Sequence, residues 1–182
     1  MSTPIKKWVI IAVCGVAILL IYLIGIKTGE HAARKQIAQI ALDQPNMPRP
    51  AILTWANEAA MTALSYDFAN YKQQLQNAAE YFTPDGWQGF MQALKNANEL
   101  DAIQKNKLAT SAVPTGTPEI IEQGEKNGVY MWRINIPMLL TYASATGATK
   151  QPLTITLLIQ RTTKYIGKRG LGIVSFVSTE KK

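Results

Sequence analysis

Residues 128–142 read GVYMWRINIPMLLTY, and this stretch decides the fold of the chain. Apolar and polar side chains alternate toward Ile136, as in a strand with one buried face, and residues 138–142 continue the strand beyond Pro137. Because proline donates no hydrogen bond to a neighbouring strand, Pro137 predicts a bulge or an edge at this point. Further strands are predicted at residues 153–159, which are rich in β-branched side chains, and at 173–177. Glycine-containing turns such as Asn127-Gly128 separate them, so the chain beyond about residue 109 predicts about four antiparallel strands.

The chain between about residues 51 and 108 has helical spacing instead. Apolar residues recur at three- and four-residue steps from residue 55 to 66, from 68 to 82 and from 87 to 100. Thr83 followed by Pro84 is typical of a helix start, with Thr83 as the N-cap. Three helices followed by about four strands predict an α+β domain, in which the helices cover one face of the sheet.

An uncharged apolar segment precedes this domain. Residues 8–26 read WVIIAVCGVAILLIYLIGI and are long enough, as a helix, to cross most of a bilayer core. The segment is longer than the apolar part of a signal peptide, and no small-x-small cleavage pattern directly follows it, so we expect a retained transmembrane helix. The residues expected at the membrane interface are Lys6, Lys7, Trp8 and Lys27. The basic residues on the two sides are nearly balanced and do not choose an orientation.

The remaining organisation follows from composition. Residues 27–50 are predicted to form a juxtamembrane helix and then an extended, semi-rigid linker that contains Pro45, Pro48 and Pro50. Residues 51–182 form the predicted folded domain. The net charge is +7, and much of it flanks the apolar segment, which favours contact with anionic lipid head groups. No basic face interleaved with aromatic residues is seen, so direct nucleic-acid binding is not expected.

The predicted domain has few side chains suited to catalysis. The single cysteine, Cys14, lies in the apolar segment, and the single histidine, His31, lies just beyond it. Nucleophile–histidine pairs and most metal-ligand sets are therefore excluded from the domain, and we expect no catalytic, metal or cofactor site. The carboxylates of the domain have simpler interpretations than catalysis. A solvated strand edge accounts for Glu119, Glu122 and Glu125. Capping of helices accounts for Asp67, Asp85 and Asp101. The tryptophans of the domain, at positions 55, 87 and 132, are expected in the core.

Basic residues near the C-terminus allow two interpretations. They either protect a sheet edge as solvated charges or form a docking surface for an acidic partner. The candidate docking residues are Arg161, Lys164, Lys168 and Arg169.

An ordered series of short motifs resembles one family. These motifs are LTWANEAA (53–60), YDFANY (66–71), FTPDGW (82–87), SAV (111–113), Gly116, YMWR (130–133), IPMLLTY (136–142) and RGLGI (169–173). They resemble the DotI/IcmL family of Dot/Icm type IV secretion systems, whose relatives include the TraM proteins of I-type conjugative plasmids. The resemblance covers about residues 50–178. Two departures are a segment of only about seven residues before the apolar span, where family members usually have more, and Ser175, where glutamine is expected.

The resemblance implies a bacterial inner-membrane protein with a single span. It implies that residues 1–7 are cytoplasmic and that residues 51–182 form a periplasmic NTF2-like domain, with three helices on a curved antiparallel sheet of about four strands. It also implies a homo-oligomeric assembly component that contacts the bilayer and other secretion subunits, such as a DotJ-like protein. The family contributes no catalytic residues. The resemblance does not say whether the secretion system of this chain exports effector proteins or transfers plasmids.

Two other classes of function stay open. NTF2-like folds also host enzymes, which would need a deep pocket with a carboxylate beside a tyrosine or aspartate, and the sequence shows no such pair at a suggestive spacing. The main alternative is a membrane-tethered periplasmic module that binds a ligand or a peptide. Fold alone does not choose among the three.

Overall fold

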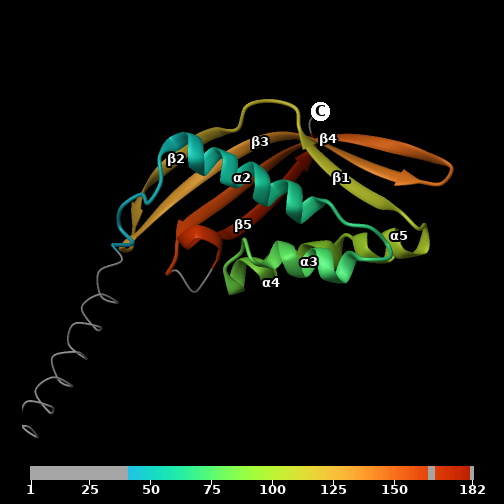
Figure 1. Cartoon of the computed structure of the whole chain (residues 1–182), viewed down its shortest axis with the longest axis horizontal. Coiled ribbons are helices and arrows are strands. Elements are labelled where there is room, and N and C mark those ends of the chain that lie inside the picture. The colour runs from blue at the N-terminus through green and yellow to red at the C-terminus, as the bar shows by residue number, and fades with distance from the viewer. Residues whose placement is uncertain (1–40, 164–166, 181–182) are drawn as a thin grey trace, which may run out of the picture. The chain divides into compact units, whose positions relative to one another are not determined.

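The computed structural model describes residues 41–163 and 167–180 (Figure 1). From Leu42 on, the chain forms one compact unit. The predicted span at residues 8–26 and its interface residues Lys6, Lys7, Trp8 and Lys27 lie outside the described residues. None of the helices within the described ranges is long and apolar enough to cross a membrane.

The described chain runs through helices first and strands second, which confirms the α+β class. The helices are α2 (Arg49–Leu64), α3 (Tyr71–Ala79), α4 (Pro84–Asn96) and α5 (Glu99–Lys105). The strands are β1 (Ala109–Pro114), β2 (Glu119–Lys126), β3 (Val129–Ser144), β4 (Gly147–Arg161) and β5 (Leu171–Glu180), and the 3-10 turn η1 (Lys168–Gly170) precedes β5.

The predicted helix count is wrong by one, since the described chain has four helices rather than three, and the expected sheet of about four strands has five. The apolar stripe at residues 87–100 predicts one helix, but Asn98 adopts a left-handed backbone with φ of 51°, which separates α4 from α5. Asparagine accepts this conformation more readily than most residues. The additional strand arises because β1 and β2 are two separate short strands on one edge of β3.

The sheet is antiparallel, with strand order β1-β3-β4-β5 and with β2 paired to β3 as well. β1 pairs with residues 138–143 of β3, and β2 pairs with residues 129–135 of the same strand. Pro137 falls in the gap between these two partners, and its carbonyl accepts a hydrogen bond from the Thr115 N–H at 2.9 Å. In an antiparallel strand a residue's N and O point to the same side, so the missing N–H of Pro137 faces this gap and costs no bond to β4.

The edge predicted at Pro137 is therefore the place along β3 where its pairing with β2 ends and its pairing with β1 begins. The alternative prediction of a bulge is wrong for β3 and β4, whose register runs without a shift from Met131–Gln160 to Ser144–Gly147. The predicted turn at Asn127-Gly128 is confirmed as a two-residue hairpin between β2 and β3, with positive φ at both residues (56° and 79°), as a type I′ turn requires.

The core lies between the helices and one face of the sheet. Alternate side chains of β3, from Trp132 to Leu140, are buried, and the same alternation runs along β4 from Leu153 to Ile159. Figure 1 shows α2 lying across the sheet and α4 near β5. The buried side of α2 combines Trp55 with a row of alanines, and these small side chains let the helix approach the strands closely.

The start of α4 is bonded directly to β5. The Thr83 hydroxyl accepts from the Gly86 N–H at 3.1 Å and donates to the Ile173 carbonyl at 3.2 Å, which confirms the predicted N-cap. The Thr83 N–H donates to the same carbonyl at 3.0 Å, and the Ile173 N–H donates to the Tyr81 carbonyl at 2.8 Å. A side chain at Gly86 would place its Cβ 2.0 Å from the Ile173 oxygen, so only glycine fits this contact.

The predicted linker is partly folded. Over residues 42–48 it is fixed to the strand ends: the Tyr130 N–H donates to the Leu42 carbonyl at 2.6 Å, and the Asn46 side-chain amide donates to the Arg169 carbonyl at 2.9 Å. Pro48 then serves as the N-cap residue of α2. The compact unit thus begins at Leu42, nine residues before the predicted boundary at residue 51.

Candidate functional site

The four candidate docking residues do not form one exposed patch. Arg161, at the end of β4, is only 8% exposed, and its Nη1 donates to the Gln44 carbonyl at 3.0 Å. Burial lowers the pKa of this guanidinium, and the nearby charge of Asp43 acts in the opposite direction. The prediction of Arg161 as an exposed docking residue is therefore wrong: its side chain joins the linker to the sheet. Lys164 lies outside the described residues.

The structure does bring Lys168 and Arg169 together on the turn η1. The Lys168 ammonium lies 3.0 Å from a carboxylate oxygen of Glu80 and 4.4 Å from the centre of the Tyr81 ring. The hydrogen bond to Glu80 raises the pKa of Lys168, although partial burial acts against it. Arg169 is exposed and has a left-handed backbone (φ 60°). This corner presents one paired and one exposed cation.

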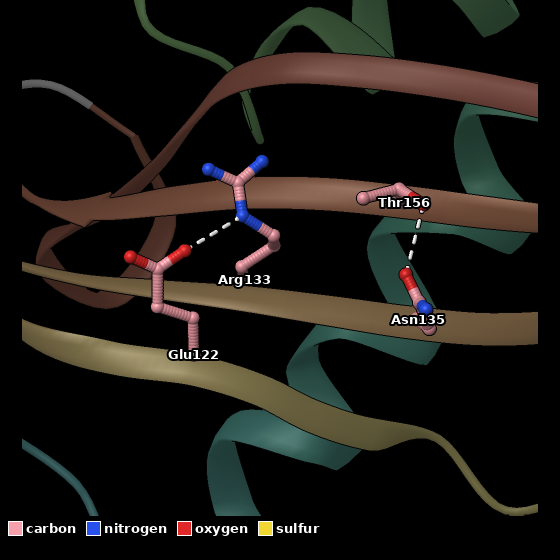
Figure 2. Close-up of polar contacts among 4 residues, drawn as sticks. All are labelled: Glu122, Arg133, Asn135 and Thr156. Carbon is pink, nitrogen blue, oxygen red and sulfur yellow. Dashed lines mark hydrogen bonds and ion pairs between the residues drawn. The ribbon is translucent and has the colours of Figure 1, made fainter.

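The carboxylates of β2 lie along an exposed strand edge, as expected from the sequence. Glu122 accepts from the Arg133 Nε at 2.9 Å across the β2–β3 pair (Figure 2), and Glu125 accepts from the Gly128 N–H. Within the part of the chain that the structure describes, no group of three His, Cys, Asp or Glu side chains is placed to hold a metal ion.

The face of the sheet opposite α2 carries cross-strand polar pairs (Figure 2). Besides the Glu122–Arg133 pair, the Thr156 hydroxyl donates to the Asn135 side-chain oxygen at 2.8 Å. Neighbouring side chains on this face, such as Met131 and Leu158, are half-buried. This face is therefore mixed in polarity, and its hydrogen bonds are made within the sheet.

The helix-cap interpretation holds for Asp67 but is wrong for Asp85 and Asp101, which lie in the first turns of α4 and α5 after the N-cap residues Thr83 and Asn98. Asp67 accepts from the Ala69 and Asn70 N–H groups at 2.8 and 2.9 Å, and these bonds, with Asn70 the largest contribution, lower its pKa.

The core interpretation holds for two of the three tryptophans. Trp55 and Trp132 are buried in the core. Trp87 is only partly buried and packs edge-on against Phe82, with ring centres 5.4 Å apart.

One polar cluster was not predicted from the sequence. Tyr66 follows α2, Tyr142 lies in β3 and Glu99 begins α5, and the three side chains line one cavity. Burial, together with the charge of Glu99, raises the pKa of both phenols. Their separation along the chain hides this cluster. Two features of the sequence point toward this cluster. Tyr142 lies near the end of β3 and is on the same face as the buried residues of that strand, and Glu99 directly follows Asn98, where the helix breaks.

In the described residues, four helices on one face of a five-stranded antiparallel sheet agree with the expected NTF2-like fold. The soluble domain of TrwG from Bartonella grahamii shares this fold, with a TM-score of 0.60 at 13% identity over 75% of this chain and 98% of that one. A family model described as "Type-IV b secretion system, inner-membrane complex component" matches residues 30–180. The chain belongs to this DotI/IcmL family, as the sequence motifs predict.

Solved structures agree with this assignment. The periplasmic domain of DotI is 41% identical, with a TM-score of 0.73 over 76% of this chain and 99% of that one. An IcmL-like type IV secretion protein from Legionella pneumophila is 30% identical, with a TM-score of 0.69 over 76% and 96% of the two chains. A periplasmic fragment of TraM has a TM-score of 0.67 at 24% identity over 74% and 98%. No curated protein sequence matches the chain.

Proposed function

We propose that this chain is a non-enzymatic assembly component of the inner-membrane complex of a type IVB secretion or conjugation system. The observation that carries the proposal is the family match, which extends over residues 30–180 and so includes residues before the folded unit. The 41% identity to the periplasmic domain of DotI, over nearly all of that domain, supports the same role. Its function then consists of contacts with the bilayer, with further copies of itself and with other secretion subunits, such as a DotJ-like protein.

A genetic transfer assay tests this function. In a strain that lacks the chain, effector export or plasmid transfer should be lost, and expression of the full chain should restore it. Glu99→Gln serves as a check on an enzymatic role, because Glu99 is the described carboxylate that lies beside two tyrosines. An assembly component keeps its transfer activity with this change. Loss of transfer at a normal protein level would contradict a purely structural role, because Glu99 would then be needed for a reaction or for ligand binding.

The proposed topology is a single span at residues 8–26, with the C-terminal domain in the periplasm. The apolar segment and the periplasmic origin of the 41% identical DotI domain support it. Because Cys14 is the only cysteine, the variant Cys14→Ala with Lys126→Cys carries one thiol, in the exposed β2–β3 hairpin. A membrane-impermeant maleimide should label this thiol in intact spheroplasts. Labelling only after lysis would contradict the topology.

The corner at η1 is the proposed docking point for an acidic surface of another subunit. Arg169 is exposed there, and Lys168 keeps part of its surface in solvent. Arg169→Glu should reduce recovery of partner subunits from solubilised membranes. Lys105→Glu makes the same charge change at an exposed position of α5 and should leave recovery unchanged. Equal recovery with both variants would remove this corner from the interface.

A further inference from the structure

A cavity of about 440 Å³ lies between α4 and the sheet, apart from the surfaces described above. Its walls are largely apolar and come from α2, α4 and three strands. They include Leu64, Phe90, Leu94, Leu140, Leu153 and Phe176. Phe90 and Phe176 pack edge to face with ring centres 5.0 Å apart. The volume is within the range of small-molecule sites, about 300–1,000 Å³.

The rim of the cavity is built from small or exposed residues. Ala93 of α4 and Ala97, the C-cap residue one turn further along, are both exposed. On the opposite side, Val177 and Ser178 of β5 are also exposed. Because no long side chain extends from these two alanines, the cavity is open to a ligand from solution.

One end of the cavity is polar and acidic. Tyr66 is 3% exposed, and Tyr142 and Glu99, which line the same end of the cavity, are half-buried. Burial raises the pKa of both phenols, so they stay protonated and act as hydrogen-bond donors at neutral pH. The ion pairs among residues 41–163 and 167–180 join Arg133 to Glu122 and Lys168 to Glu80, and neither includes Glu99. A half-buried carboxylate thus lines a largely apolar cavity without an ion-pair partner among the described residues.

We propose that this cavity is a binding site for a small organic amine, whose apolar body fills the cavity and whose ammonium group pairs with Glu99. An anion would be repelled by this carboxylate. A neutral apolar ligand would cover it and leave it without a counter-charge, which costs binding free energy. An ammonium group satisfies the carboxylate and is also attracted to aromatic faces such as those of the two tyrosines. This inference goes beyond the assembly role and does not depend on it.

The experiment compares an amine with its neutral counterpart on the full-length protein in lipid nanodiscs. 2-Phenylethylamine and 2-phenylethanol are titrated by saturation-transfer NMR, and empty nanodiscs give the partitioning background. The amine should bind at least about tenfold tighter than the alcohol, because a charge-assisted hydrogen bond to Glu99 is stronger than a neutral one. Glu99→Gln should remove this preference. Equal affinities of the two probes for the unmodified protein, or an unchanged preference in Glu99→Gln, would overturn the proposal.

A second pair of variants locates the site. Ala93→Trp places a large side chain at the rim and should abolish amine binding. Gln92→Trp puts the same bulk on the neighbouring exposed position of α4, which does not line the cavity, and should leave binding intact. Circular dichroism melting curves check that both variants are folded. Equal binding by both folded variants would place the amine elsewhere.

Discussion

Gly86→Ala should unfold the domain more easily, although the same change usually stabilises a helix. The new methyl carbon would lie 2.0 Å from the Ile173 carbonyl oxygen and 3.0 Å from the Thr83 hydroxyl oxygen. The start of α4 must therefore move away from β5. This movement breaks the Thr83 N–H and Thr83 hydroxyl bonds to Ile173 and the Gly86 N–H bond to the Thr83 hydroxyl.

The net effect follows from two opposing contributions. Three hydrogen bonds of about 1 kcal/mol each are lost, so the cost is about 3 kcal/mol. Alanine has a better helix propensity than glycine by about 1 kcal/mol. The free energy of unfolding should therefore fall by about 2 kcal/mol.

Gly89→Ala is the matched control on the same helix. Nothing lies within 4 Å of its new methyl group, so this variant should gain about 0.5–1 kcal/mol. Urea unfolding of residues 42–182, followed by tryptophan fluorescence, measures both variants. A Gly86→Ala variant as stable as the unmodified domain, or equal shifts for both glycines, would refute the close contact between α4 and β5.

Three further predictions concern polar contacts. The pKa of Asp67 is lowered by folding, so its charge stabilises the fold above the unfolded pKa, and this contribution is lost as pH falls through the folded pKa. The stability difference between the unmodified domain and Asp67→Asn, measured by urea unfolding at each pH, should therefore be full at about pH 7 and decrease as pH falls below the ordinary aspartate pKa of 3.8. Arg161→Ala should speed hydrogen exchange at residues 42–47 by about tenfold, because their anchoring bond is lost; mass spectrometry of deuterium uptake measures this, and unchanged uptake would contradict the anchoring role. Lys168→Ala should cost less than about 1 kcal/mol in urea unfolding, because its ion pair with Glu80 is largely exposed, and a larger loss would contradict this assignment.

The features that the sequence predicts correctly are those that depend on residues close together along the chain, such as strand patterns, helix caps and tight turns. The alternation in 128–142 depends on the two-residue period of a strand, and β3 has this pattern of burial. The Thr83 cap and the Asn127-Gly128 turn also depend on local chemistry, and both are confirmed. The break at Asn98 was missed because the apolar stripe on both sides keeps helical spacing through it.

Contacts between distant parts of the chain could not be predicted in the same way. Arg161 counted as an exposed charge because charged side chains usually are, but the linker carbonyl of Gln44 gives its guanidinium a buried partner. The cluster of Glu99, Tyr66 and Tyr142 requires α5, the chain after α2 and the end of β3 to meet. Nothing in the spacing of these three residues indicates that meeting.

The assembly role is tested most directly by purifying the full-length protein from gently solubilised membranes and identifying by mass spectrometry what comes with it. The account predicts a large particle that contains other inner-membrane subunits of a type IV secretion or conjugation system. Recovery of a small species without partners, from cells that assemble an active system, would contradict it.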